Sequence, residues 1–218
     1  CSSDLFTSGR RKRVGSSFNF GFPVPNTVRT RIFAGYSIAR TVYEQFENSD
    51  DTSLFSLPPG TQSTFLTGIT RNTVDHPIFP TSGSRLSWNM EFNGGILGGS
   101  ANFVKHTFEG VWWTPVGQIG RGAPGAGGGT PVALGITVNA GAIFGNDTAF
   151  PFDRFWMGGV QFGQSLRGYD ETSITPTGYF AKDAAGIRDV DRLGNAFFKI
   201  TAEYAIRIKG AASAQLFF

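Results

Sequence analysis

Residues of the kinds that carry out catalysis or bind metals are few in this chain and lie far apart. It has one cysteine, Cys1, and two histidines, His76 and His106, in different segments. A metal site needs three or four close ligands, and the adjacent acids Asp170 and Glu171 point apart in an extended chain. No serine–histidine–aspartate arrangement is present. We therefore expect no enzymatic activity and neither a metal nor a cofactor.

A glycine-rich stretch at 120–125 matches the string G-x-G-x-x-G of dinucleotide-binding proteins. In those proteins the glycines follow a strand and open a helix, which brings backbone amides to the pyrophosphate. Pro124 and the glycines at 127–129 oppose a helix here. The stretch is predicted to be a flexible turn.

Two features near the start admit more than one interpretation. Cys1 could be the lipid-modified first residue of a processed lipoprotein, or the point at which a longer sequence was cut, since no initiator methionine or signal peptide precedes it. Arg11, Lys12 and Arg13 form a basic cluster just before a predicted strand. Such a cluster is usually a solvated loop, but on the outer surface it could pair with lipopolysaccharide phosphates.

Composition sets broad limits on the fold. The chain has 218 residues, a net charge of +3 and only 16% charged residues, whereas a typical soluble domain has roughly 25%. Aromatic residues make up 14%, and there are 30 glycines. This composition excludes a charged disordered tail, and we expect no nucleic acid as a partner. No apolar run is long enough for a transmembrane helix.

Apolar and polar residues alternate along several segments, as they do in strands that have one apolar face. These segments are 14–22, 28–42, 63–72, 84–93, 102–114, 132–145 and 196–208, with a cut-off eighth at 213–218. The alternation is clearest in 84–93, where polar residues occupy the whole of the opposite face. Its apolar face, which is predicted to contact lipid, consists of Leu86, Trp88, Met90 and Phe92.

Strand length and the polar face favour a membrane barrel over a soluble sandwich. Several strands exceed the roughly 5–6 residues usual in globular sheets and could cross a bilayer when tilted, and small polar residues suit a water-filled lumen. In outer-membrane barrels short periplasmic turns alternate with longer extracellular loops, and most connections here follow this rule. The exceptions are 94–101, which is short where a long loop is expected, and 115–131, which is long where a short turn is expected. The longest connection, 146–195, shows no strand of its own. The sequence predicts an all-β, antiparallel transmembrane β-barrel, in which 146–195 is a long extracellular loop.

The predicted strands are too few to close such a barrel. Outer-membrane barrels have at least about eight strands, and an open edge in lipid would leave backbone groups unpaired. We therefore expect residues 1–218 to be part of a single barrel domain whose other strands come from chain outside this sequence.

The long loop contains one specific signal, a lone arginine among aromatic residues and glycines. Its residues are Leu166, Arg167, Gly168 and Tyr169, preceded by Gly158 and Gly159. This pattern is unlike a solvated loop and indicates a packed hairpin with a buried guanidinium. A buried guanidinium needs a carboxylate partner.

These residues resemble the BamA-like superfamily of outer-membrane assembly factors, in which a (V/L)RG(F/Y) motif lies on an extracellular loop that folds back into the barrel. A second match is the family's R-x-T-x-D…P-x-x-G pattern, found at a periplasmic turn. Its residues here are Arg71, Thr73, Asp75, Pro80 and Gly83. The resemblance extends from about residue 14 to the end of the chain.

The resemblance implies a barrel of about sixteen strands, of which this chain would supply a central part without the POTRA domains and without the first and last strands of the lateral gate. It implies insertion of nascent outer-membrane proteins, with membrane lipid, lipopolysaccharide and accessory lipoproteins as further partners. In the family, a lumen carboxylate on the strand after the long loop is the usual partner of the motif arginine. Strand parity gives Glu203 this position, and an exposed Arg167 with no fixed partner is the alternative.

The turn at 71–83 is expected to be structural. We expect Asp75 to cap backbone amides or to pair with Arg71 at the periplasmic rim.

Three other functions stay open from the sequence. A two-partner-secretion transporter belongs to the same superfamily, but the R-x-T-x-D turn favours the assembly factor. A porin or diffusion channel predicts a constriction loop lined with charges. An outer-membrane lipase or protease would need a nucleophile–base pair, which the sequence does not offer.

Overall fold

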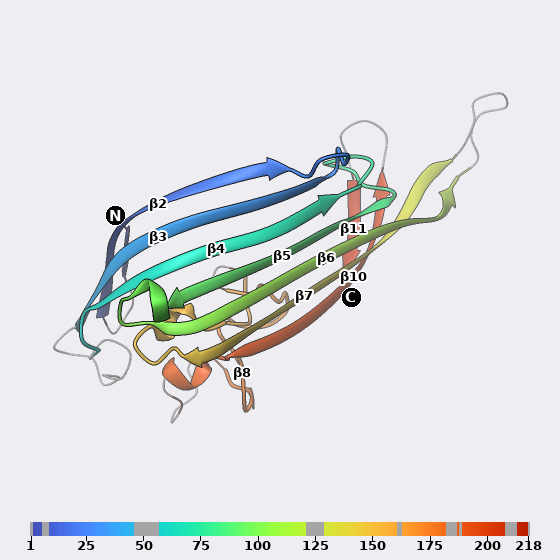
Figure 1. The fold of residues 1–218 in the computed structure, drawn as a ribbon. Coiled ribbons are helices and arrows are strands. Elements are labelled where there is room, and N and C mark those ends of the chain that lie inside the picture. Colours follow the sequence, from blue (N-terminus) through green and yellow to red (C-terminus); the bar gives the residue numbers. More distant parts are fainter. Residues whose placement is uncertain are drawn as a thin grey trace.

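The computed structural model describes residues 2–5, 9–45, 57–120, 129–160, 163–181, 187, 189–207 and 213–217. Most of them form one antiparallel sheet of nine strands in the order β1-β2-β3-β4-β5-β6-β7-β10-β11 (Figure 1). The strands are β1 (Ser2–Leu5), β2 (Gly9–Pro23), β3 (Thr30–Gln45), β4 (Gly60–Asn72), β5 (Gly83–Gly94), β6 (Asn102–Ile119), β7 (Thr130–Asn146), β10 (Ala196–Arg207) and β11 (Ser213–Phe217). The predicted all-β antiparallel fold is confirmed.

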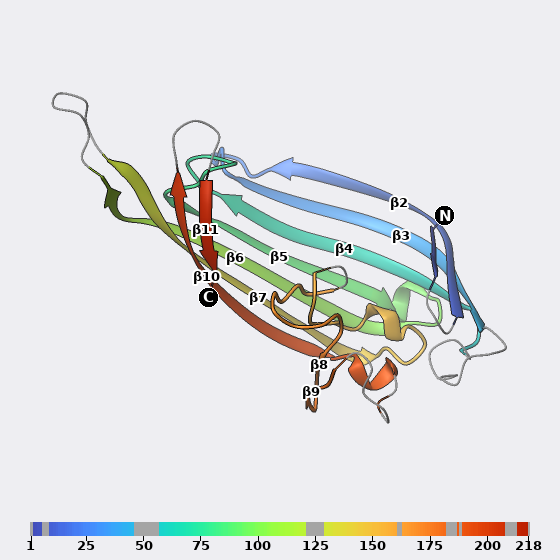
Figure 2. The same cartoon turned by 180° about the vertical axis from the view of Figure 1, so that it is seen from behind.

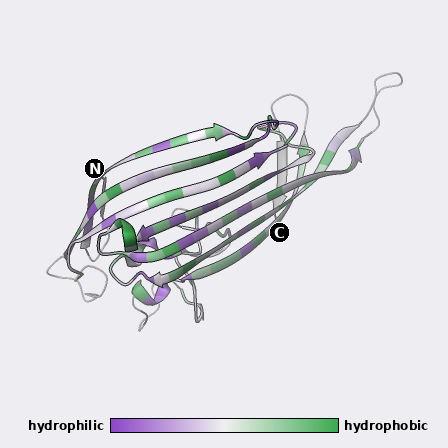
Figure 3. Cartoon of the chain, viewed as in Figure 1, coloured by the Kyte–Doolittle hydropathy of each residue, from purple (hydrophilic) through white to green (hydrophobic). Residues whose placement is uncertain are grey.

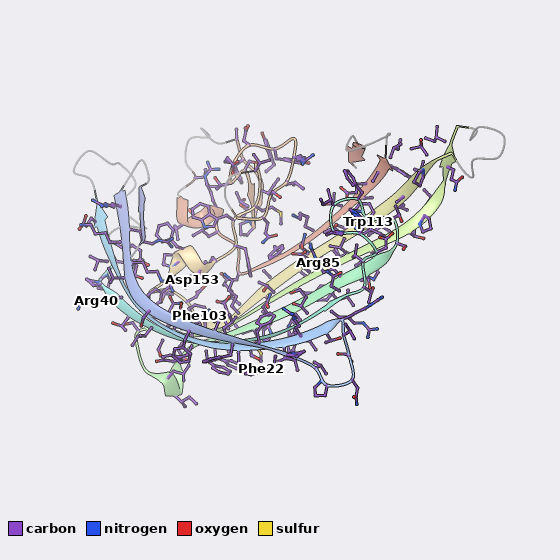
Figure 4. The ribbon with its side chains drawn as sticks, turned by 90° about the horizontal axis from the view of Figure 1, so that it is seen from above. Phe22, Arg40, Arg85, Phe103, Trp113 and Asp153 are labelled. Carbon is purple, nitrogen blue, oxygen red and sulfur yellow. The ribbon has the colours of Figure 1, made fainter. Side chains whose placement is uncertain are left out.

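The sheet is bent into a trough with a convex and a concave face (Figure 4). Apolar and polar residues alternate along the strands (Figure 3), and the rings of Phe18, Phe20 and Phe22 are more than half exposed on the convex side. The segment joining β7 to β10 lies over the concave side (Figure 2). Among the described residues, no helix has the length and hydropathy needed to cross a bilayer.

The hairpin of β6 and β7 is longer than predicted. Strand β6 continues to Ile119 and β7 begins at Thr130, so much of the connection expected at 115–131 is strand. A register shift between Pro115 and Gly117 accommodates the proline, which cannot donate a ladder hydrogen bond. The hairpin projects beyond the neighbouring strands (Figure 1). The connection 115–131 seemed too long for a turn because it contains the ends of both strands.

Two further predictions need correction. The cluster Arg11–Arg13 is part of β2 and pairs with β1, a strand the sequence did not predict because four residues are too few to show a period. The long connection contains strands β8 (Ile174–Thr175) and β9 (Gly178–Tyr179), and the 3₁₀ turns η2 (Pro151–Asp153) and η3 (Asp189–Arg192). The turn at 94–101 includes the 3₁₀ turn η1 (Gly95–Leu97). Cys1 and residues 121–128, which hold most of the glycine-rich stretch, lie outside the described residues.

Candidate functional site

The first turn of the long connection is fixed by one ion pair. Arg154 donates from Nε to Asp147 Oδ2 at 2.7 Å and from Nη2 to Asp147 Oδ1 at 2.8 Å. Two parallel charge-assisted hydrogen bonds hold both groups in one geometry. The Asp147 side chain is almost entirely buried, so this pair sets the direction in which the chain leaves β7.

Two phenylalanines attach this turn to the concave wall. Phe150 and Phe155 are 3% and 7% exposed and pack in one apolar cluster with Phe103. The Phe155 ring also meets the ring of Phe197 on β10, with centroids 4.6 Å apart and an interplanar angle of 61°. The loop therefore buries aromatic surface against an apolar part of the concave face, and Figure 4 shows Phe103 on this side of the sheet.

Glycines in the wall make room for both rings. A Cβ added at Gly60 would lie 2.8 Å from the Phe150 ring, and one added at Gly141 would lie 2.6 Å from the Phe155 ring. Both distances are too short for any other residue without a shift of the loop. From the sequence, Gly141 was expected on the polar face of 132–145 and Gly60 in the connection 43–62, so the contact of each glycine with a ring was missed.

A polar network lies beside the aromatic anchor. Gln62 Nε2 donates to Asp153 Oδ2 at 2.7 Å and to Asn93 Oδ1 at 2.9 Å, and Asn93 also accepts from Thr64 Oγ1 at 2.6 Å. Lys105 Nζ donates to the Asp153 carbonyl at 2.7 Å and lies 4.9 Å from the centre of the Phe155 ring. Because Gln62 and Asn93 are buried, removing a partner would leave a desolvated polar group.

Strand β2 adds a third contact and divides the basic cluster between the two faces. The Arg11 guanidinium lies 4.9 Å from the centre of the Phe152 ring, which also stacks on Tyr43 with centroids 5.8 Å apart. Lys12, the next residue, pairs instead with Glu44. Arg11 therefore contacts the long loop, and Lys12 lies on the convex face.

The glycine pair and the LRGY motif meet inside the loop. Gly159 donates its N–H to the Tyr169 carbonyl at 3.1 Å and accepts from the Leu166 N–H at 2.8 Å. Gly158 has a φ of 118°, and a Cβ there would lie 2.5 Å from the Asp170 carbonyl oxygen. Only glycine satisfies both conditions without strain. The motif thus forms the packed hairpin that its composition indicated.

The structure brings Arg167 toward Glu203. The Arg167 side chain is exposed in the open sheet that this chain forms, and burial of its guanidinium in the barrel stays a prediction. Its charge acts electrostatically on the Glu203 carboxyl. A neighbouring contact is direct, since Lys199 Nζ on β10 donates to the Ser165 carbonyl at 3.0 Å. Two basic residues therefore lie between the hairpin and β10: Arg167 belongs to the hairpin and Lys199 to β10.

The turn between β4 and β5 lies at the opposite end of the strands from the long loop (Figure 1). Asp75 accepts hydrogen bonds from the backbone N–H groups of His76, Thr81 and Ser82 at 3.0, 2.9 and 3.1 Å. Desolvation alone would raise the pKa of Asp75, but these bonds and one from the Thr81 hydroxyl hold it well below its usual range. Asp75 was expected either to cap backbone amides or to pair with Arg71, and in the structure it caps backbone amides.

Other residues of the turn motif support the same reversal. Thr73 donates its N–H to the Ser84 carbonyl at 2.7 Å and accepts from the Ser84 N–H at its hydroxyl at 2.9 Å. Gly83 has a φ of 102°, and a Cβ there would lie 2.4 Å from the Thr73 carbonyl oxygen. Pro80 and Glu203 line the same groove, of about 640 Å³, between this turn and the concave wall. Glu203 therefore lies between the turn and the LRGY hairpin.

We expect Asp75→Ala to destabilise the protein by about 1 kcal/mol, as for the loss of a side-chain cap. Because the folded-state pKa is depressed, the contribution of Asp75 is complete above its unfolded pKa of about 3.9 and is lost as the pH falls further. Urea unfolding in lipid vesicles at pH 7 and pH 3 measures both effects. Asp75→Asn, which keeps one acceptor but has no charge, should lose less stability and show no such pH dependence. Equal losses at both pH values for Asp75→Ala would contradict the role of the charge.

Comparison with known proteins decides the family. Residues 2–218 match the Omp85 superfamily domain. The chain belongs to the Omp85 superfamily. Omp85 proteins are integral outer-membrane proteins that transport or assemble other proteins and are not enzymes, so the predicted family, location and lack of enzymatic activity are confirmed.

Two Omp85 relatives are similar over most of the chain. The outer membrane protein assembly factor BamA of Nitratidesulfovibrio vulgaris is 27% identical over 179 residues, which are 80% of this chain and 20% of that protein. The crystal structure of BamA from Haemophilus ducreyi lacking POTRA domains 1–3 matches with a TM-score of 0.66 at 15% identity, covering 92% of this chain and 38% of that one. The chain thus spans well under half the length of these relatives, and the likeness in structure shows the fold of an Omp85 barrel.

Proposed function

We propose that this chain is the central barrel part of a protein that inserts newly made outer-membrane proteins into the membrane. The observation that carries the proposal is the likeness to an assembly factor over 80% of the chain. The turn built on Thr73 and Asp75 and the hairpin built on Gly159 and Arg167 support it. No covalent bond is made or broken in this function, which agrees with the few chemically reactive residues of the sequence.

The two faces of the sheet have different roles in this proposal. The convex face, with Trp88 and Phe92 exposed, contacts lipid, and the concave face borders the aqueous lumen. The long loop lies on the extracellular side of the protein and braces the wall from within, because its anchors join it to β4, β6 and β10. Strand addition and local bilayer thinning take place at a seam formed by strands outside this sequence.

The partners follow from the same proposal. Nascent outer-membrane proteins are the substrates, membrane lipid and lipopolysaccharide surround the convex face, and accessory lipoproteins assist from the periplasm. The hairpin that contains Arg167 is directed to the lumen and forms no catalytic site.

Depletion of the full-length protein from its native host tests this function against the alternatives. An assembly factor predicts that many unrelated barrel proteins disappear from the outer membrane. Loss of one or a few secreted polypeptides, with barrel proteins retained, would instead indicate a two-partner-secretion transporter. Loss of small-solute permeability alone would indicate a diffusion channel, and either of these results would overturn the proposal.

A double-mutant cycle tests the link between the hairpin and the wall. We expect Arg167→Ala and Glu203→Ala each to increase proteolysis of the loop, with the double variant little worse than either, because both remove the same interaction. For an exposed pair the coupling should be about 0.5–1 kcal/mol. The same cycle with Asp170→Ala in place of Glu203→Ala is the control and should be additive. Additive losses for Arg167 and Glu203 would show that they act independently.

A further inference from the structure

The convex face carries a group of charges at one end of β2 and β3. The register pairs Phe18 with Tyr36, and residues an even number of positions away along each strand lie on the same face. Arg10, Lys12 and Arg40 therefore lie on the convex face, and Figure 4 shows Arg40 on the outside of the curve.

One acid lies within this group and balances part of its charge. Glu44 forms an ion pair with Lys12 at 2.5 Å, and Arg10 acts electrostatically on the same carboxylate. Among the described residues, Glu44 is the one acid that these cations are shown to share, and it pairs directly with Lys12. Arg40 is exposed and forms neither an ion pair nor a hydrogen bond with any other residue in the described ranges. Arg40 is therefore a positive charge that a ligand could neutralise.

The position of Arg40 relative to the aromatic rings indicates its depth in the membrane. A row of rings, Phe18, Tyr36, Phe65 and Phe92, crosses β2 to β5 in register. Aromatic rings are typical of the boundary between hydrocarbon and head groups. Arg40 lies four residues beyond Tyr36, about 13 Å along the strand. An unpaired guanidinium is costly in hydrocarbon, but at this level it can bind head-group phosphates with two hydrogen bonds.

An apolar cleft lies beside η1, whose segment contacts the cross-strand neighbour of Arg40. The segment containing η1 folds back over the convex face (Figure 4), and Ser100 donates its N–H to the carbonyl of Thr61 at 2.7 Å. Thr61 is the cross-strand neighbour of Arg40. The cleft has a volume of about 530 Å³. Its apolar lining consists of Phe65, Phe92, Ile96, Leu97, Val104 and Phe144.

We propose that this part of the convex face binds one molecule of a phosphorylated lipid with several acyl chains, of the lipid A type. A phosphate would bind Arg40 and Lys12, and one acyl chain would enter the cleft beside Ile96. A free phosphate would use only the charges, whereas the apolar cleft beside η1 favours a lipid. The inference rests on the proposed function only for the orientation of the strands in the outer membrane.

Native mass spectrometry of the full-length protein in detergent tests this site. The probes are bisphosphorylated lipid A, the same lipid without phosphates, and inorganic phosphate. We expect saturable binding of one lipid A molecule, weakened about fivefold for each charge removed and about thirtyfold in Arg40→Gln/Lys12→Gln. Arg29→Gln/Arg31→Gln, which removes two charges at the other end of β3, is the matched control and should bind as the unchanged protein does.

Three results would overturn the proposal. They are unchanged affinity in Arg40→Gln/Lys12→Gln, equal binding of the lipid without phosphates, and competition by inorganic phosphate at the same concentration as lipid A. If the double variant does not fold, Ile96→Ser/Leu97→Ser tests the cleft, and unchanged lipid affinity there would also overturn it. Because binding is measured without any substrate barrel, a failure of the proposed insertion function would leave this result interpretable.

Discussion

Phe155→Ala is expected to detach the long loop from the barrel wall and to destabilise the protein by about 3–5 kcal/mol, as for other buried phenylalanines. Phe155 is 7% exposed and contacts Phe197 and Lys105 at once, so its loss leaves a cavity and removes the partner of a charged group. Limited trypsin cleavage at the exposed Arg167, together with urea unfolding in vesicles, measures both effects.

The same anchor can be tested from the wall. Gly141→Ala should also raise the rate of cleavage, because its Cβ would lie 2.6 Å from the Phe155 ring. Tyr179→Ala is the control, since Tyr179 belongs to the same loop but is 57% exposed, and it should change little. Cleavage that increases equally in Tyr179→Ala and Phe155→Ala would show that Phe155 is not the anchor.

Trp88→Arg is expected to cost about 2–4 kcal/mol if the site lies near the bilayer midplane, because it places a charge on the lipid face. Trp88 is 43% exposed on the convex face and stacks on His106, with ring centroids 5.9 Å apart. Asn89→Arg, one residue further on, projects into the lumen and should be mild. Folding yield into lipid vesicles measures the difference.

Equal yields for Trp88→Arg and Asn89→Arg would contradict the assignment of the two faces. The new residue is the same and the two positions are adjacent in β5. Trp88→Phe, which removes the indole without adding a charge, is the control for the loss of the contact with His106 and should reduce the yield less than Trp88→Arg.

The strands and their two faces could be predicted because alternation is a local property. In β5, residues two apart share an environment, so Leu86, Trp88 and Phe92 could be assigned together from the sequence. Strand β1 and the pair β8–β9 could not be predicted, since two to four residues show no period. The first residues of β2 were not predicted to be strand because Arg11 and Lys12 are adjacent charges and break the alternation. They lie at the end of the strand, where both faces tolerate charge.

The anchors of the loop could not be predicted for a different reason. Gly60 and Phe150 are far apart in the sequence, and nothing local in either shows that a ring lies over a glycine. Gln62 and Asp153 likewise look like ordinary polar residues until the fold brings them together. The contact between Gly159 and Leu166 could be predicted only from the family motif, in which a glycine pair precedes the LRGY residues.

Arg167 shows which part of a loop a local pattern can predict. Its glycine-rich surroundings indicated a packed hairpin, and the hairpin forms through the backbone hydrogen bonds of Gly159. The buried rings that attach the loop to the wall, Phe150 and Phe155, lie in its first turn. The pairing of Arg167 with Glu203 joins residues far apart in the sequence, so burial of its guanidinium stays a prediction.

Insertion of a barrel protein into lipid vesicles tests the central claim most directly. The full-length protein is reconstituted, an unfolded outer-membrane barrel is added, and folding is followed by protease resistance. We predict that folding is faster than in empty vesicles, and that Phe155→Ala reduces the gain while Tyr179→Ala does not. Folding no faster than in empty vesicles, with steady ion conductance through the reconstituted protein, would contradict the account and identify a channel.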